Sequence, residues 1–202
     1  MSRREEVLEV LTGSEVTRIR FSFLSLYGTP VAVDNTTFMR VAQAIMSGFV
    51  QVPESGIAPG SGGQYDGRPQ SGGVLYARPT RNNRNRKCSI VHEAVHASFD
   101  LTRSTISEVD NETASFLSEY LYLRFTAYPI RTLLEDNPHQ ARFAELLWRA
   151  TGYIARGDSV PTWQIDEIRR QISERPDYSY VLSEGCLDGA SDCFYVLTAQ
   201  NG

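Results

Sequence analysis

The chain has 202 residues and a formal net charge of −4, and 41% of its residues are apolar. This composition suits one globular domain and excludes a collagen, a coiled coil and a disulfide scaffold. The acidic balance argues against nucleic acid or an anionic membrane surface as partner, because attraction to phosphate needs a positive surface. No apolar stretch is long enough to span a bilayer, so we expect no membrane association.

Two features of the sequence indicate a cytoplasmic protein. The first residues carry Arg3 and Arg4 directly before two glutamates, with no apolar segment of the kind found in signal peptides. The three cysteines, Cys88, Cys186 and Cys193, make an odd count, which is more typical of a reducing compartment than of secretion. Cys186 and Cys193 are close enough in the chain to pair within one loop.

The first half of the chain predicts short strands mixed with helices. Helical spacing of apolar residues predicts helices over 3–12 and 36–47. Alternating or continuous β-branched and aromatic runs predict strands within 16–33, at 49–52 and at 74–77. A tract rich in Gly, Ser and Pro follows at 55–73, which is typical of a functional loop or an unstructured connection, and Tyr65 is its aromatic residue.

The second half predicts helices. They are expected over 89–101, 107–125, 137–156 and 161–175, the second beginning at Ser107 in a sequence that resembles a capping box. The sequence therefore predicts one domain over 1–202 with an α+β fold. A small mixed or antiparallel N-terminal sheet (14–80) is expected to pack on a helical C-terminal half (88–175), followed by a short β-like tail at 178–198.

The most informative motif is His92-Glu93-Ala94-Val95-His96, an HExxH pattern in a chain with only three histidines. On a helix, residues four apart share one face about 6 Å apart along the axis. Two imidazoles in that arrangement can bind one Zn²⁺, and Glu93 can then reach a water on the metal rather than the metal itself. The motif predicts a zinc centre with Glu93 as general acid and base.

A catalytic zinc site needs a third protein ligand, and a carboxylate of the next helix is the best candidate. Glu112 is preferred, because it lies one turn inside that helix with small residues beside it. Glu108 and Glu119 remain alternatives. Asp100 and Cys88 lie too far along the first helix to join both histidines, and Cys88 is expected to be an inert thiol.

With these residues in place, the sequence resembles the zincin metallopeptidases, and within them the gluzincins. The resemblance covers about residues 74–125 and includes the local pattern Asn111-Glu112-Thr113-Ala114. It implies hydrolysis of peptide bonds in a peptide or protein substrate. It also implies that an edge strand binds the substrate, and Val74, Leu75, Tyr76 and Ala77 occupy that place in chain order.

The resemblance further implies a donor that stabilises the developing oxyanion. The candidates are His139, Tyr120, Tyr122 and Tyr128. The short interval between His96 and Glu112 requires a tight turn at 102–106. The basic segment 78–87 is expected to be a solvated loop.

Three functions remain open from the sequence. The first is a zinc metallopeptidase, and the second is a non-catalytic binding module with a structural or vestigial zinc site, closed by a cysteine or His139. The third is a delivered toxin or effector with the same chemistry. The oligomeric state is left open.

Overall fold

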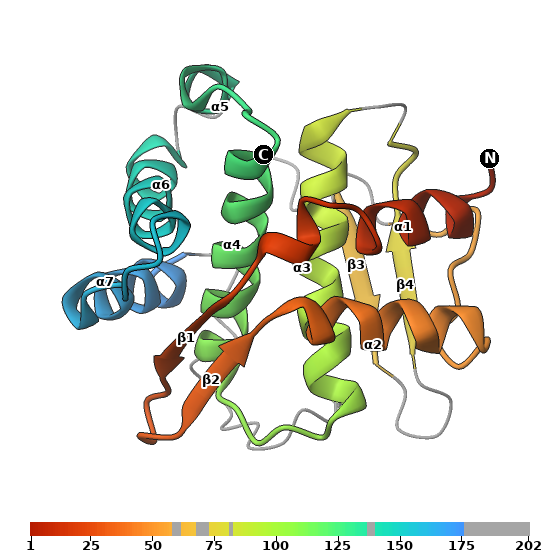
Figure 1. Ribbon diagram of the computed structural model, residues 1–202, viewed down its shortest axis with the longest axis horizontal. Helices are drawn as coiled ribbons and strands as arrows, with labels where there is room; N and C mark the ends of the chain where they lie inside the picture. Colours follow the sequence, from red (N-terminus) through yellow and green to blue (C-terminus); the bar gives the residue numbers. More distant parts are fainter. Residues whose placement is uncertain (58–61, 68–72, 81–82, 137–139, 176–202) are drawn as a thin grey trace.

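The computed structural model describes residues 1–57, 62–67, 73–80, 83–136 and 140–175 (Figure 1). Its elements confirm the predicted α+β class. They are, in chain order, α1 (Arg3–Leu11), the 3₁₀ helix η1 (Val16–Arg18), β1 (Phe21–Leu24), β2 (Pro30–Val33), α2 (Asn35–Met46), β3 (Gly63–Asp66), β4 (Val74–Ala77), α3 (Arg84–Leu101), α4 (Glu108–Phe125), α5 (Ile130–Asp136), α6 (Ala141–Ala155) and α7 (Thr162–Ser173).

The strands form two separate antiparallel hairpins instead of the one small sheet that the sequence predicted. In the first, β1 pairs with β2 so that Phe21 lies opposite Val33, and Gly28 at φ +76° makes the turn possible. In the second, β3 pairs with β4 so that Gly63 lies opposite Ala77. The first hairpin packs against α4 and the second against α3.

The second hairpin corrects two expectations about the chain. Residues 63–66 of the Gly-rich tract form β3, although the sequence showed no strand there. The predicted strand 49–52 is reduced to a single parallel bridge between Gln51 and Val74. Both outcomes were decided by pairing with a distant segment, which cannot be predicted from local composition.

Helices α3 and α4 lie antiparallel side by side at the centre of the molecule (Figure 1). Small buried residues, among them Ala94 and Ala114, allow the two helices to approach closely. The turn between them is tight, as predicted, and Arg103 adopts φ +50° there. Ser107 caps α4 at the predicted place by accepting a hydrogen bond from the amide of Asp110.

The helical half differs from the prediction at several boundaries. α3 begins at Arg84 instead of Ser89, so the last part of the basic segment 78–87 is helical and not a loop. Asn83 explains this start, because its side chain accepts hydrogen bonds from two amides of the first turn. α5 was not predicted, and α6 begins at Ala141 instead of residue 137.

Some expectations fall outside the described residues, namely those for His139, Cys186, Cys193 and the tail 178–198. In the described ranges, the buried apolar side chains of both hairpins and the helices form one continuous core cluster. No helix in these ranges combines the length and apolar character needed to cross a membrane.

Candidate metal centre

His92 and His96 lie one turn apart on the face of α3 that packs against α4. Their rings are 4.9 Å apart between centroids, and His92 is only 8% exposed. The ring of Phe116, from α4, packs edge-on against His92 at 4.7 Å. The predicted pairing of two imidazoles on one helical face is therefore present, with an aromatic ring packed against His92.

Glu112 of α4 brings a carboxylate to both imidazoles. Its Oε2 lies 3.4 Å from Nε2 of His92, and its Oε1 lies 3.6 Å from Nε2 of His96. One ligand atom from each of these three residues lies within 4.8 Å of the others. Of the three glutamates considered from the sequence, Glu112 is the one that faces both histidines.

The other ring nitrogens of the two histidines have their own partners. Nδ1 of His92 lies 3.1 Å from Oε2 of Glu119, and Nδ1 of His96 lies 3.0 Å from Oδ1 of Asn111. A hydrogen bond at Nδ1 sets the orientation of an imidazole and leaves Nε2 as the available ligand atom. Both Nε2 atoms consequently point to the same place beside Glu112.

Glu93 is held beside the centre by β3. A Cβ atom at Gly63 would lie 2.8 Å from Cγ of Glu93, so only glycine lets the strand come this close. The backbone amide of Tyr65 hydrogen bonds to the Glu93 carboxylate. The Tyr65 side chain, 6% exposed, donates its hydroxyl hydrogen to Asp100 at 2.6 Å and thereby anchors β3 to α3.

The electrostatics of the centre follow from burial and from the proximity of opposite charges. Burial lowers the pKa of His96 to about 4 and raises that of Glu93 to about 7. Burial also disfavours charge on His92, but the adjacent carboxylates of Glu112 and Glu119 outweigh this effect and raise its pKa. Burial alone would raise the pKa of Glu112, but the adjacent histidines lower it below the ordinary value.

The two alternative glutamates have other surroundings. Glu119 contacts His92 through Nδ1, not Nε2, and its second oxygen accepts the Cys88 thiol at 3.3 Å. Burial raises the pKa of Glu108 to about 8, and its buried Oε1 has no hydrogen-bond partner among the described residues. Cys88 is completely buried, and burial raises its pKa, in agreement with an inert thiol.

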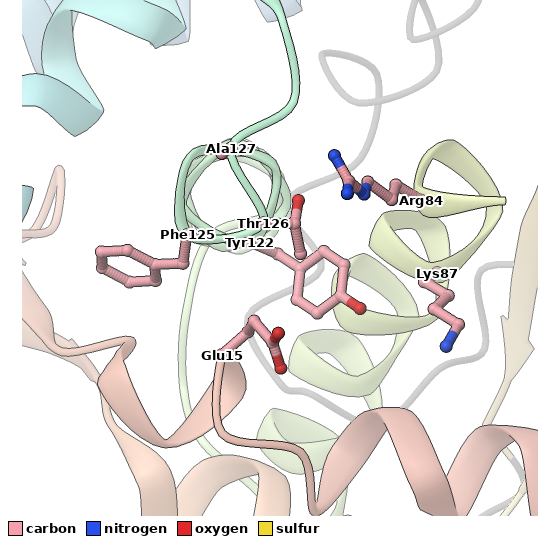
Figure 2. Close-up of a pocket in the computed structure, with 7 residues that line it drawn as sticks. All are labelled: Glu15, Arg84, Lys87, Tyr122, Phe125, Thr126 and Ala127. Atoms are coloured by element: carbon pink, nitrogen blue, oxygen red, sulfur yellow. The ribbon is translucent and has the colours of Figure 1, made fainter. Parts of the chain in front are cut away.

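The three tyrosines considered as oxyanion donors have different surroundings in the structure. Tyr122 is directed into a different cavity, beside Arg84 and Lys87 (Figure 2). Tyr120 is 8% exposed, and burial, together with the nearby Glu119, raises the pKa of its hydroxyl. Tyr128 packs against the core cluster.

β4 has the predicted bounds, Val74–Ala77. It pairs with β3 along one side, and on the other side the amide of Leu75 donates to the carbonyl oxygen of Gln51 at 2.9 Å. Both edges of β4 are thus paired at Leu75, and Gly63 of β3 is the strand residue that lies against Glu93.

Four further contributors were not identified from the sequence. Asn111 and Glu119 orient the histidines, whereas the sequence had indicated Asn111 only as part of a local pattern and Glu119 only as an alternative ligand. Gly63 gave no indication because it lies in a tract with seven glycines. The charge of Arg175, which follows α7, acts on Glu112, and its guanidinium lies 5.7 Å from the centroid of the Phe116 ring.

Comparisons with protein-family models, with curated protein sequences and with solved structures found no match to this chain. What the centre can do chemically consequently follows from its own donor set on α3, α4 and β3. That set is two imidazole nitrogens and one carboxylate that converge, with a second carboxylate adjacent.

Proposed function

We propose that this protein is a zinc metallopeptidase that hydrolyses peptide bonds in a peptide or protein substrate. The observation that carries the proposal is the convergence of His92 Nε2, His96 Nε2 and the Glu112 carboxylate, with Glu93 on the same helix beside them. Two histidines and a carboxylate are a common ligand set of catalytic zinc.

The surroundings of the three side chains support a metal ion between them. Oε2 of Glu112 is buried and has no hydrogen-bond partner in the described part of the chain, although a buried carboxylate oxygen normally has one. Nδ1 of each histidine has its own partner, which leaves both Nε2 atoms to a metal. His92, His96 and Glu112 would hold the ion.

When bound there, zinc supplies a Lewis acid that polarises the scissile carbonyl and lowers the pKa of water. Glu93 takes the proton from the water that attacks the carbonyl carbon, and the same carboxyl returns it to the amine nitrogen as the C–N bond breaks. Burial raises the pKa of Glu93 above the ordinary value of a carboxyl, which favours return of the proton to the leaving nitrogen. Glu119 and Asn111 keep the imidazoles oriented.

The test measures zinc content and peptide hydrolysis on the same preparations. We expect about one zinc per chain and cleavage within a mixed peptide library. His96→Ala should lose both. Glu93→Gln should keep the metal and the fold but lower kcat/KM by about 10²- to 10⁴-fold.

Glu145→Gln, on an exposed position of α6, is the matched control and should retain full activity. A folded, zinc-loaded Glu93→Gln protein with normal activity would contradict the mechanism. Zinc held by four protein ligands, without hydrolysis, would instead identify the structural centre of a binding module.

A further inference from the structure

A second candidate site lies between the start of α3 and the end of α4. It is a cavity of about 430 Å³, and Figure 2 shows Arg84 and Lys87 on one side, Tyr122 from α4 with Thr126 just after that helix, and Glu15 opposite. The proposed peptidase function uses none of these residues. The cavity therefore requires a separate explanation.

The first turn of α3 is unusually basic. It carries Arg84, Arg86 and Lys87 and no acidic residue, although the amino end of a helix favours negative charge. Arg86 donates to the carbonyl oxygen of Pro79 at 2.8 Å, and Lys87 forms an ion pair with Glu9 at 3.1 Å. Arg84 makes neither a hydrogen bond nor an ion pair with any described residue, so its five donors are available to a ligand.

Tyr122 gives an independent indication of a ligand. Its side chain is 4% exposed, and its hydroxyl has no hydrogen-bond partner within the described ranges. Figure 2 shows the ring inside the cavity with its hydroxyl directed towards the side of Lys87. Burial raises the pKa of Tyr122 to about 12, so the hydroxyl keeps its proton and serves as a donor.

Glu15 supplies the opposite chemistry on the facing wall. It accepts a hydrogen bond from the Ser14 hydroxyl at 3.2 Å, and no cation in the described part of the chain pairs with it. A bare anion would be repelled by this carboxylate. A ligand can bind both sides of the cavity if its anionic group contacts Arg84 and Lys87 and its hydroxyl group donates to Glu15.

We propose that this cavity binds a small phosphate monoester with a hydroxyl-bearing organic part, such that Arg84, Lys87 and Tyr122 hold the phosphate and Glu15 accepts from a hydroxyl. A tetrahedral phosphate presents oxygens to three donors that approach from different directions, whereas a planar carboxylate presents two. The proposal is independent of the zinc centre.

Calorimetric titration of the full chain with glycerol phosphate and with inorganic phosphate tests the proposal. Glycerol phosphate should bind more tightly than inorganic phosphate. Arg84→Ala should weaken both by about 10- to 100-fold, and Tyr122→Phe by about 2- to 10-fold. Glu15→Gln should remove the preference for glycerol phosphate while inorganic phosphate binds at least as well as before.

Two controls keep these results specific. Arg86→Ala removes the same charge from the same turn but does not line the cavity, and it should bind like the wild type. His96→Ala should also bind normally, which separates the cavity from any anion at the zinc centre. Failure of glycerol phosphate to bind, equal binding of the two probes, or binding unaffected by Arg84→Ala would each overturn the proposal.

Discussion

Two buried carboxylates of α4, Asp110 and Glu112, stand two residues apart and have opposite surroundings. Asp110 is 0% exposed and accepts hydrogen bonds from the amide of Leu26 at 3.0 Å and from the hydroxyl of Ser107 at 2.6 Å. It also forms an ion pair with Arg169 at 2.6 Å. Glu112 is 3% exposed, and its Oε2 has no hydrogen-bond partner among the described residues.

The difference separates a charge that is satisfied within the fold from one that could still bind a ligand. Asp110 joins three parts of the molecule, since its partners come from the first hairpin, the start of α4 and α7, and it has all the donors that it needs. Glu112 faces two imidazoles instead and keeps part of its bonding capacity. A buried charge that the protein itself leaves incompletely satisfied is the better candidate for ligand binding.

The largest effect is expected from removing the partner of Asp110. Arg169→Ala leaves the Asp110 charge buried without its cation, and the free energy of unfolding should fall by about 3–5 kcal/mol. Chemical denaturation measures this. Asp166→Ala, which removes the exposed partner of Arg169, should cost at most about 1 kcal/mol. Equal effects of the two substitutions would contradict the structural role of Asp110.

Zinc should stabilise the folded protein by binding at Glu112 and not at Asp110. Free zinc at about 100 times its dissociation constant should raise the free energy of unfolding by about 2.7 kcal/mol, because it binds only the folded state. Thermal unfolding with zinc and with a chelator measures the difference. Glu112→Gln should greatly reduce the shift, and Glu145→Gln should retain it. A wild-type melting temperature that does not respond to zinc would argue against the centre.

The orienting contact from Glu119 should have an intermediate effect. Glu119→Gln weakens the hydrogen bond to Nδ1 of His92, and zinc affinity should fall by about 10- to 100-fold. Competition with a chromogenic chelator measures the affinity. Glu108→Gln, whose carboxyl forms no hydrogen bond or ion pair with either imidazole among the described residues, should have a smaller effect. The reverse order would mean that Glu108 is the more important carboxylate.

The smallest effect is expected for two serines of α4, Ser107 at its N-cap and Ser115 within the helix. Ser107→Ala removes both the cap of α4 and the hydroxyl donor to Asp110, and should cost about 0.5–2 kcal/mol. Ser115→Ala removes a buried hydroxyl without a hydrogen-bond partner in the described ranges, and should be neutral or slightly stabilising. Urea denaturation distinguishes the two, and a greater loss for Ser115→Ala would be inconsistent with these contacts.

Much of the centre could be predicted because its geometry is local. Two histidines four residues apart on a helix must share a face, whatever the rest of the chain does. The start of α4 could be located because the Ser107 side chain caps its own helix. The early start of α3 was missed, although Asn83 is an ordinary capping residue, because the charges of the segment 78–87 favoured a loop.

By itself, the sequence determined the α+β class, the helical HExxH pair and the position of β4, since each depends on neighbours within a few residues. The tertiary structure decided the rest. The antiparallel packing of α3 and α4 selected Glu112, not Glu108 or Glu119, to face both histidines. Pairing with β4 turned a glycine tract into β3 and put Gly63 against Glu93. These outcomes depend on contacts between segments that are far apart in the chain. Local sequence patterns do not show which distant segments will meet.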